Sequence, residues 1–402
     1  MHAFSNLSFA CRHAWEQRQL GEVAEKTGSG GTPVSSNPRY YGGSIPFLGI
    51  GDINGRYVDT TQKTLTEEGV ANSAAWIVPE GAISLAMYAS YGKSAILARP
   101  MATSQAFFNI VFRSNVTRDF VYSRLQCAES RHEWDVLVST GTQPNLSGSK
   151  LKKWTIGYPS LPEQRRIGEF FSTLDSLIAA AERQEALLRQ KKQAYLQLMF
   201  PQEGETQPRL RFAGFSGRWE RRQLGDVISA AGIKNKERQN LQSYSISNQS
   251  GFVPQSEQFD NGGKPLDADK SSYWIVAPHS FAYNPARINV GSIGYWDGKE
   301  PVIVSSLYEV FQTHESVDDS FLLNWFQTCL FTNQIAKRQE GGVRQYFFFD
   351  KLQESLISLP TLPEQQRIGE FFYILDSLIA TAEKHTESSR ALKSSYLQRM
   401  FV

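Results

Sequence analysis

The sequence predicts an α+β protein in which two pseudo-symmetric mixed α/β globules are separated by two long helices that form an antiparallel coiled coil. The first observation is a stretch that occurs twice, at residues 161–200 and 362–401, with roughly 25 of 40 aligned positions identical and no gap. The second is the recurrence of apolar residues every seven positions, which is typical of a coiled-coil seam. The third is that the segments before each copy also resemble each other, so the duplication covers the whole chain.

Each repeated stretch is predicted to form one long helix. Ser160-x-x-Glu163 and Thr361-x-x-Glu364 have the spacing of capping boxes, and a proline stands in each first turn. Pro201 ends the first helix and opens a polar linker. At about 1.5 Å per residue each helix spans on the order of 55 Å and would work as a spacer. The alternative is a pair of ordinary core helices, which seldom run this long with one seam.

The predicted seam consists of the residues that repeat every seven positions. They are Ile167, Leu174, Ala181, Leu188 and Tyr195 in the first helix, and Ile368, Leu375, Ala382, Ser389 and Tyr396 in the second. Seven-residue spacing sustained over this length predicts that the two helices pair along one stripe.

The segments before the helices are predicted to be globules that combine a twisted sheet with helices. Short β-rich runs broken by Gly, Pro, Asn and Ser predict strands at 82–85, 96–97, 107–112, 302–304 and 308–311. Helices are predicted at 120–129 and 321–338. The predicted domains are 1–160 and 209–361 for the globules, 161–200 and 362–402 for the helices, and 201–208 for the linker.

The composition favours a folded intracellular protein. The chain has 402 residues, 41% of them hydrophobic and 12% aromatic, which allows two or three domains with ample core. No apolar run approaches the length of a membrane span, and no basic segment with an apolar stretch opens the chain, so we expect neither membrane insertion nor secretion. Three isolated cysteines, Cys11, Cys127 and Cys329, fit the reduced cytoplasm and not a zinc site.

The duplicated layout suggests a DNA-binding geometry. If the helices pair antiparallel, the globules lie at opposite ends, related by an approximate two-fold axis. Duplex DNA has the same symmetry, and two binding units on a rigid spacer read half-sites at a fixed separation. Because the globules differ outside a few matching islands, we expect two different half-sites. A net charge of only +2 means that such a protein must concentrate its positive charge on one face.

The motifs of the chain resemble those of a known family. The repeated LPEQ-x-R-I-G-E-F-F helices, the openings W-E-x-R-Q-L-G at Trp15 and Trp219, and the double layout resemble the specificity subunit of Type I restriction–modification systems over essentially the full length. The resemblance implies that each globule is a target recognition domain and each helix a conserved spacer. It also implies that the protein is non-catalytic and recognises a bipartite target in double-stranded DNA.

The resemblance further implies partner subunits. It predicts docking of two adenine-N6 methyltransferase subunits and, in the full complex, of two translocating endonuclease subunits. No cofactor of the chain itself is expected.

Two rival classes remain open. In the first, the chain would itself be a DNA adenine methyltransferase, because Phe47–Gly51 has the form F-x-G-x-G of a cofactor loop and Tyr283–Arg287 is similar to an N-P-P catalytic loop. A strand-like segment follows the first motif where a helix is needed, and Ala286 and Arg287 replace the Pro and the stacking ring of the second. The other rival is a coiled-coil adaptor that binds only proteins. We find no catalytic constellation and no metal-ligand spacing in the sequence.

DNA contacts are expected on loops that carry Arg, Lys, amides and hydroxyls, because these groups read base edges and bind phosphates. The predicted DNA-binding residues are Thr32, Ser35, Arg39, Tyr88, Tyr91, Lys93, Gln143 and Asn145 in the first half, and Lys234, Lys236, Arg238, Arg287, Asn289, Arg344, Gln345 and Tyr346 in the second.

One pair of aligned segments is predicted to determine specificity. In the match of 141–151 with 342–352, Gln143 faces Arg344 and Asn145 faces Tyr346. Gln and Asn suit adenine, whereas Arg suits guanine. Replacing Arg344 by Ala should relax one base pair of the target at a cost of roughly 1–3 kcal/mol. The alternative is a variable surface loop without a role in recognition.

Overall fold

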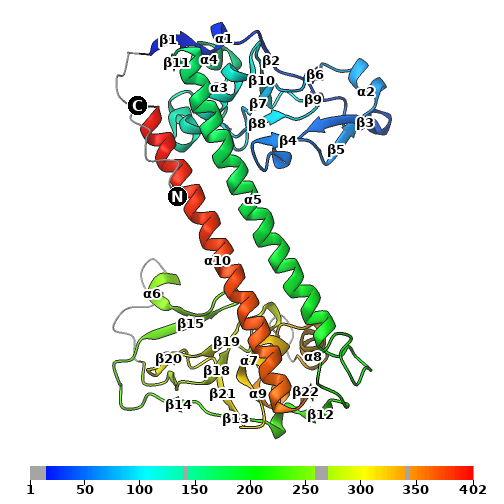
Figure 1. The fold of residues 1–402 in the computed structure, drawn as a ribbon, viewed down its shortest axis with the longest axis vertical. Coiled ribbons are helices and arrows are strands. Elements are labelled where there is room, and N and C mark those ends of the chain that lie inside the picture. Colours follow the sequence, from blue (N-terminus) through cyan, green and yellow to red (C-terminus); the bar gives the residue numbers. More distant parts are fainter. Residues whose placement is uncertain (1–14, 139–143, 259–269, 340–344, 402) are drawn as a thin grey trace. The chain divides into compact units, whose positions relative to one another are not determined.

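The computed structural model describes residues 15–138, 144–258, 270–339 and 345–401. The chain divides into two compact units (Figure 1): unit 1 comprises Met1–Gln184 with Ala382–Val402, and unit 2 comprises Glu185–Thr381. Two long helices, α5 (Leu161–Met199) and α10 (Leu362–Met400), each contribute to both units. Each unit therefore contains one globule together with a part of each long helix.

The globule of unit 1 alternates short strands with short helices. Its strands are β1 (Glu16–Gln19), β2 (Lys26–Gly28), β3 (Tyr41–Leu48), β4 (Tyr57–Val58), β5 (Lys63–Leu65), β6 (Trp76–Val78), β7 (Ile83–Ala86), β8 (Ser94–Leu97), β9 (Met101–Thr103), β10 (Phe107–Val111) and β11 (Thr155–Tyr158). Its helices are α1 (Leu20–Val23), α2 (Glu67–Ala71), α3 (Asn115–Ser130) and α4 (Gly148–Lys153), with 3-10 turns η1 (Pro38–Tyr40), η2 (Ile50–Asp52) and η3 (Glu133–Val136).

The globule of unit 2 has a similar succession. Its strands are β12 (Glu220–Gln223), β13 (Ile228–Ala230), β14 (Ile233–Lys234), β15 (Ser243–Ser247), β16 (Gly251–Pro254), β17 (Trp274–Val276), β18 (Ser280–Tyr283), β19 (Ile293–Trp296), β20 (Val302–Val304), β21 (Glu309–Thr313) and β22 (Leu356–Leu359). Its helices are α6 (Gln255–Gln258), α7 (Asp319–Trp325), α8 (Cys329–Arg338) and α9 (Phe349–Gln353), with 3-10 turns η4 (Leu224–Asp226) and η5 (Ile288–Val290).

Both globules share one sheet topology. The strand order β2-β10-β7-β8 in unit 1 has the same connectivity as β13-β21-β18-β19 in unit 2, and β4 adds a further strand in unit 1. A second sheet follows the order β5-β3-β9-β6 in unit 1 and β14-β17-β20-β15-β16 in unit 2. Pairing is mostly antiparallel, with parallel pairs β3·β9 and β15·β20 at corresponding places. The predicted mixed α/β globules and their common frame are therefore confirmed.

The core of each globule continues onto the long helices. In unit 1, Phe171 and Leu174 of α5 join the same buried cluster as Phe120 of α3 and Leu397 near the end of α10. In unit 2, Phe372 of α10 joins the corresponding cluster with Phe321 of α7, and Leu196 of α5 belongs to it. Parts of both long helices thus belong to the core of each unit.

The two long helices pack antiparallel inside each unit, and the contacts repeat. In unit 1 the rings of Phe170 and Tyr396 meet edge to face with centroids 5.0 Å apart. In unit 2 the rings of Tyr195 and Phe371 meet in the same way at 5.0 Å. An ion pair accompanies each ring pair: Asp175 lies 2.6 Å from Lys393 in unit 1, and Asp376 lies 2.6 Å from Lys192 in unit 2. The predicted antiparallel coiled coil is confirmed.

Burial along the predicted seam follows the heptads. Ile167, Leu174, Ala181, Ile368, Leu375 and Ala382 are buried, and Leu188, Tyr195, Ser389 and Tyr396 are half-buried. A second row of positions, each four residues after a seam position, is also buried. Its buried members are Phe171, Ile178, Met199, Phe372, Ile379 and Thr386.

The sequence repeated at the start of each long helix attaches the helix to its globule. Gln164 is fully buried, donates to the Pro159 carbonyl at 2.8 Å and accepts from the Thr117 hydroxyl at 3.1 Å. Gln365 makes the matching bonds, to the Pro360 carbonyl at 3.0 Å and from the Asp318 N–H at 3.0 Å. The repeated sequence L-P-E-Q therefore specifies a docking contact as well as a helix start.

Two details differ from the sequence prediction. The helix expected at 321–338 is two helices, because Thr328 is extended and its hydroxyl donates to the Trp325 carbonyl at the end of α7. The break lets the rings of Phe326 and Phe331 pack 4.8 Å apart inside the core, which compensates for the lost helical turn. The predicted strands are confirmed with shifted ends. None of the helices in the described part of the chain is both long and apolar enough to cross a membrane.

Candidate nucleic-acid interface

Four predicted DNA-binding residues of unit 2 surround one cavity. Arg287 and Asn289 lie in the loop 284–292 between β18 and β19, and Gln345 and Tyr346 lie in the segment before α9. The N–H of Phe347 donates to the Pro285 carbonyl at 3.0 Å, which holds the two segments side by side. The cavity has a volume of about 910 Å³. Residues that the sequence separates by more than 50 positions thus form one polar site.

Aromatic rings form the other part of this cavity. Tyr346 and Phe348 stack with centroids 5.4 Å apart and an interplanar angle of 5°, and Phe348 is 44% exposed. Trp274 and Tyr308 also line it. Exposed rings of this kind can contact thymine methyl groups or stack on bases. The Arg287 side chain is exposed and makes no ion pair with any residue that the structure describes.

A half-buried carboxylate lies beside these rings. Glu309 begins β21 and lines the cavity. Burial raises the pKa of this carboxyl, and a backbone hydrogen bond with Phe349 opposes the rise. Glu309 therefore adds a hydrogen-bond acceptor to a lining that also contains the cationic Arg287.

Lys234, Lys236 and Arg238 lie outside the lining of this cavity. The Lys234 ammonium sits 3.3 Å from the centroid of the Trp274 ring and donates to the Ser272 carbonyl at 2.9 Å, and burial lowers its pKa. Lys234 thus supports the cavity-lining Trp274. Lys236 and Arg238 are exposed on the turn that follows, where Arg238 has a φ of 53°.

Unit 1 brings the corresponding segments together. The N–H of Leu146 donates to the Met87 carbonyl at 2.9 Å, which places Asn145 and Tyr88 on adjoining segments. Tyr88 is 37% exposed and Asn145 is half-buried. The pairing of these two loops, which the sequence predicts only as separate places, is therefore common to both units.

Tyr91 and Lys93, on the same loop as Tyr88, contact other parts of unit 1. The Tyr91 hydroxyl donates to Asp135 at 2.9 Å, and this hydrogen bond raises the pKa of the phenol. Gly92 between them has a φ of 93°, and a Cβ there would lie 2.3 Å from the Trp134 ring, so only glycine fits. Lys93 lines a separate groove of unit 1 that does not include Tyr88 or Asn145.

The glycine-rich loop of unit 1 is shaped by packing. A Cβ on Gly30 would lie 1.8 Å from the Thr103 carbonyl oxygen, so the loop passes against β9 where no side chain fits. Thr32 donates its hydroxyl to Gln105 at 2.8 Å, while Ser35 and Arg39 are exposed. The predicted specificity residues Gln143 and Arg344 lie outside the described residues.

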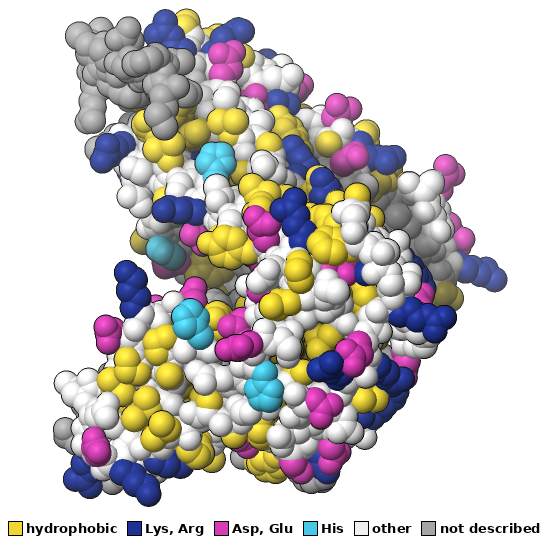
Figure 2. Space-filling model, turned by 60° about the horizontal axis from the view of Figure 1, so that its bottom comes forward, with side chains coloured by type: hydrophobic (Ala, Val, Ile, Leu, Met, Phe, Trp, Pro, Cys, Tyr) yellow, Lys and Arg dark blue, Asp and Glu magenta, His cyan; other side chains and the backbone are white. Residues whose placement is uncertain are grey.

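Charges on the visible surface are mixed. On the face shown in Figure 2, Lys and Arg side chains are interspersed with Asp and Glu. Within the described ranges, no group of three or more His, Cys, Asp or Glu side chains could hold a metal ion. The candidate interfaces are therefore local clusters on loops.

Comparison with known proteins decides the family. The chain matches the Type I restriction modification DNA specificity domain over residues 13–190 and again over 217–388. The chain belongs to this family. The double match agrees with the internal duplication, because each half carries one copy of the domain.

Curated specificity subunits are similar to parts of the chain. The Type I restriction enzyme MjaIX specificity subunit of Methanocaldococcus jannaschii is 30% identical over 177 residues, which is 43% of this chain and 41% of that protein. The EcoR124I/EcoR124II specificity subunit of Escherichia coli is 27% identical over 188 residues, 45% of this chain and 46% of that protein. Each alignment thus spans less than half of the relative.

Solved structures from Type I restriction–modification systems share the fold. The S subunit of a Type-I restriction-modification system from M. genitalium covers 98% of both chains with a TM-score of 0.61 at 13% identity. A chain from a structural study of complex assembly and conformational transition of the type I R-M system covers 97% of this chain and 98% of its own, with a TM-score of 0.55 at 17% identity. These matches show that the fold extends over the whole chain.

The specificity subunit family is non-catalytic. The two enzyme-like motifs adopt local structures that differ from those of their enzyme counterparts. The segment Phe47–Gly51 leads from β3 into the 3-10 turn η2 and then to strand β4, where a cofactor loop would enter a helix. Asn284 accepts a hydrogen bond from the Ala286 N–H at 3.0 Å, so its amide closes its own turn, and the Tyr283 ring is buried. Neither segment therefore has the local structure of the enzyme motif that it resembles.

Proposed function

We propose that this chain recognises a bipartite DNA target, with each unit reading one half-site, and that it directs modification and restriction subunits to that target. The observation that carries the proposal is the cavity of unit 2, where Arg287 and Asn289 meet Gln345 and Tyr346 in a member of the DNA specificity family. Two amides, a guanidinium and stacked rings are the groups that read base edges in the major groove.

In unit 2, Arg287 is the proposed reader of guanine, because it is exposed and its guanidinium can bind O6 and N7 together. Asn289 and Gln345 would contact adenine, and Tyr346 would pack against a thymine methyl group. Lys236 and Arg238 on the neighbouring turn, and Arg344, are proposed as further DNA contacts, with Lys234 supporting Trp274.

In unit 1, Tyr88 and Asn145 would take the corresponding part, because their segments are joined by the same backbone hydrogen bond as those of unit 2. Thr32, Ser35, Arg39 and Gln143 are proposed as further contacts, and Tyr91 as a support for its loop through Asp135. Different side chains at matching places support two different half-sites.

The long helices are proposed to set the separation of the half-sites. We assign 1–160 and 209–361 as target recognition domains, 161–200 and 362–402 as spacers, and 201–208 as the linker. Rigid pairing of α5 with α10 inside each unit supports this assignment. A fixed spacer leaves an unread stretch of DNA between the half-sites.

The proposed partners are two adenine-N6 methyltransferase subunits and, in the full complex, two translocating endonuclease subunits, in the cytoplasm. Solvent-exposed apolar side chains on the long helices support a protein partner, since their exposure costs free energy that docking recovers. They include Leu177 and Leu187 of α5 and Tyr373, Ile374 and Leu378 of α10, which are 50–69% exposed.

The test is coexpression with the methyltransferase subunit encoded beside this chain, followed by mapping of modified adenines across the host genome. The methyltransferase alone is the control. A split motif with adenines modified in both halves, present only with this chain, is the expected result. Modification without the chain, or one contiguous motif, would contradict the proposal. Binding of S-adenosylmethionine by the pure chain would instead favour the methyltransferase alternative, and an absence of salt-dependent DNA binding would favour the adaptor.

Replacing Arg287 by Ala should relax one position of a single half-site at a cost of about 1–3 kcal/mol, because one bidentate base contact is lost. Tyr346→Ala should alter the same half-site. The measurement is the modified motif together with competition binding of duplexes that differ at one base pair. Arg218→Ala, which removes an exposed arginine elsewhere in unit 2, is the matched control and should leave the motif unchanged.

A further inference from the structure

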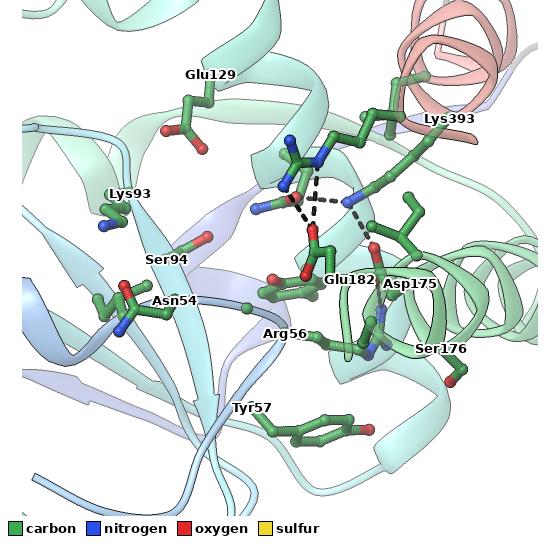
Figure 3. Close-up of a pocket in the computed structure, with 18 of the residues that line it drawn as sticks. Asn54, Arg56, Tyr57, Lys93, Ser94, Glu129, Asp175, Ser176, Glu182 and Lys393 are labelled. Carbon is green, nitrogen blue, oxygen red and sulfur yellow. Dashed lines mark hydrogen bonds and ion pairs between the residues drawn. The ribbon is translucent and has the colours of Figure 1, made fainter. Parts of the chain in front are cut away.

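A groove of unit 1 lies apart from the residues proposed to read bases. It has a volume of about 820 Å³ and is bounded by the loop before β4, the start of β8, and helices α3, α5 and α10. Figure 3 shows Lys93, Ser94 and Asn54 on one side of it and Asp175, Glu182 and Lys393 on the other. The site is therefore built from both the globule and the long helices of one unit.

Internal ion pairs neutralise two of the carboxylates in the groove. Asp175 binds Arg56 at 3.0 Å and Lys393 at 2.6 Å, and Glu182 binds Arg390 at 2.6 Å (Figure 3). These contacts take up the negative charge that faces the groove from α5. The net charge of the groove therefore depends on the lining side chains that have no such partner.

Two cations and one carboxylate remain outside this network. Lys93 and Arg183 line the groove and make no ion pair with a residue that the structure describes. Glu129 is the third acidic side chain, and burial raises its pKa while Lys93 and Lys393 oppose the rise. Five basic side chains thus face three acidic ones in the lining, which favours an anionic ligand.

A buried hydroxyl in the groove has no partner. Ser94 is 2% exposed, and its Oγ has no hydrogen-bond partner among the described residues. Figure 3 shows it at the sheet side of the groove, next to Lys93. Because an unpaired buried donor costs free energy, a ligand with acceptor oxygens would relieve it.

We propose that this groove binds a phosphate group through Lys93, Arg183 and Ser94. The inference rests on the proposed function: when unit 1 is on DNA, the phosphate is a phosphodiester of the duplex backbone. Lys93 ends the same hairpin loop that carries Tyr88, so one loop would combine a base contact with a phosphate contact. Phosphate contacts fix the register of a protein on the duplex, and base contacts specify the sequence.

The first experiment is a salt titration of duplex binding by the full-length chain with its methyltransferase subunits. The slope of log K against log salt is negative, and each lost phosphate contact should make it shallower by about 0.9. Loss of this one phosphate contact in the double variant Lys93→Gln/Arg183→Gln should then lower the ratio of affinities at 50 and 200 mM salt about 3.5-fold, with a smaller fall for each single variant, on target and non-target duplexes alike. Lys63→Gln, an exposed lysine of β5, is the matched control and should change nothing at the groove.

Glu129→Gln provides a test of the opposite sign. Removing the remaining carboxylate should strengthen duplex binding, whereas Lys93→Gln and Arg183→Gln should weaken it. A merely structural role of the groove would not produce these opposite effects. An unchanged slope in the double variant, with DNA binding intact, would overturn this inference and leave the proposed function standing. Failure of the unsubstituted complex to bind DNA would instead overturn both.

The second experiment separates the two sources of phosphate. Inorganic phosphate and ATP are titrated against the chain without DNA, with the double variant beside it. Weak binding that competes with the duplex supports the proposal. Tight ATP binding that the double variant abolishes, with no change in duplex binding, would assign the groove to a free nucleotide and overturn the DNA assignment.

Discussion

At the start of α5 the Glu163 carboxylate accepts a hydrogen bond from Trp15 Nε1 at 3.2 Å, whereas at the start of α10 Glu364 is held by Arg211. The Arg211 guanidinium, from the segment between α5 and β12, contacts both oxygens of Glu364 at 2.6 and 2.7 Å. Trp219, the counterpart of Trp15, is left with an indole N–H that has no partner among the described residues. Identical motifs therefore acquire different anchors from their neighbours.

A second difference lies farther along the helices. In unit 1 the aspartate of the helix, Asp175, is bound by Arg56 of the globule as well as by Lys393, and its side chain is 12% exposed. In unit 2 the matching Asp376 binds Lys192 and is 46% exposed. In unit 1 an ion pair thus joins the globule to its helix, whereas the ion pair at the matching place of unit 2 joins the two long helices.

The largest expected effect concerns the anchor of α10. Arg211→Ala should destabilise unit 2 by about 3–5 kcal/mol, because Glu364 is 1% exposed and would remain as a buried charge without its cation. Glu163→Gln should cost only about 1 kcal/mol, since a single hydrogen bond is weakened. Denaturant unfolding followed by tryptophan fluorescence measures both. Equal losses of stability in the two variants would contradict the difference between the two anchors.

A medium effect is expected at Arg56. Arg56→Ala should destabilise unit 1 by about 1.5–3 kcal/mol, the range for hydrogen bonds to charged groups, because Asp175 keeps Lys393 and Asp119 keeps Arg118. In unit 2, Lys192→Met removes a pair with a half-exposed carboxylate and should cost about 0.2–1 kcal/mol. Hydrogen exchange resolved by unit would show whether protection falls mainly in unit 1, as expected, or equally in both.

The smallest effect is the pH dependence that one strand pair of unit 2 contributes. Glu309 pairs with Tyr283 across β18 and β21, while the corresponding strands of unit 1 pair Phe108 with Leu85. Burial raises the folded-state pKa of Glu309 above its unfolded value. Its contribution to stability is therefore most favourable below the unfolded pKa and is lost as the pH rises through the folded one.

Glu309→Gln should accordingly stabilise unit 2 at neutral pH relative to the unsubstituted chain, and the difference should shrink toward pH 4. Thermal unfolding at several pH values provides the measurement. The matching position in unit 1 carries the buried Phe108, so this strand pair contributes no such dependence there. A difference that grows toward acid pH would have the wrong sign for this explanation.

Much of the fold could be predicted because its signals are local. Prolines and the spacing of capping boxes predict the starts of α5 and α10, and heptads predict which faces meet, since both patterns depend on residues within a few turns of one helix. The role of the capping glutamates was not predictable from this pattern. Their partners, Trp15 and Arg211, come from distant segments.

The candidate site shows the same limit. The loops at 88–93 and 287–289 and the segments at 144–147 and 345–348 were individually plausible, but only the backbone hydrogen bonds from Leu146 and Phe347 bring them together in pairs. Lys93 looked like a companion of Tyr88, yet the loop turns at Gly92 and directs it into the groove beside α3. A signal was available in Gly92 itself, because glycine often marks a change of chain direction.

The sequence alone determined the duplication, the two long antiparallel helices, the mixed globules and the resemblance to specificity subunits, since each depends on periodicity or on residues close in the chain. Only the tertiary structure decided which loops share a cavity, which carboxylate is buried with Arg211, and which lysine faces the groove. These depend on the packing of segments far apart in sequence, where side-chain volume and hydrogen-bond geometry select one arrangement among many.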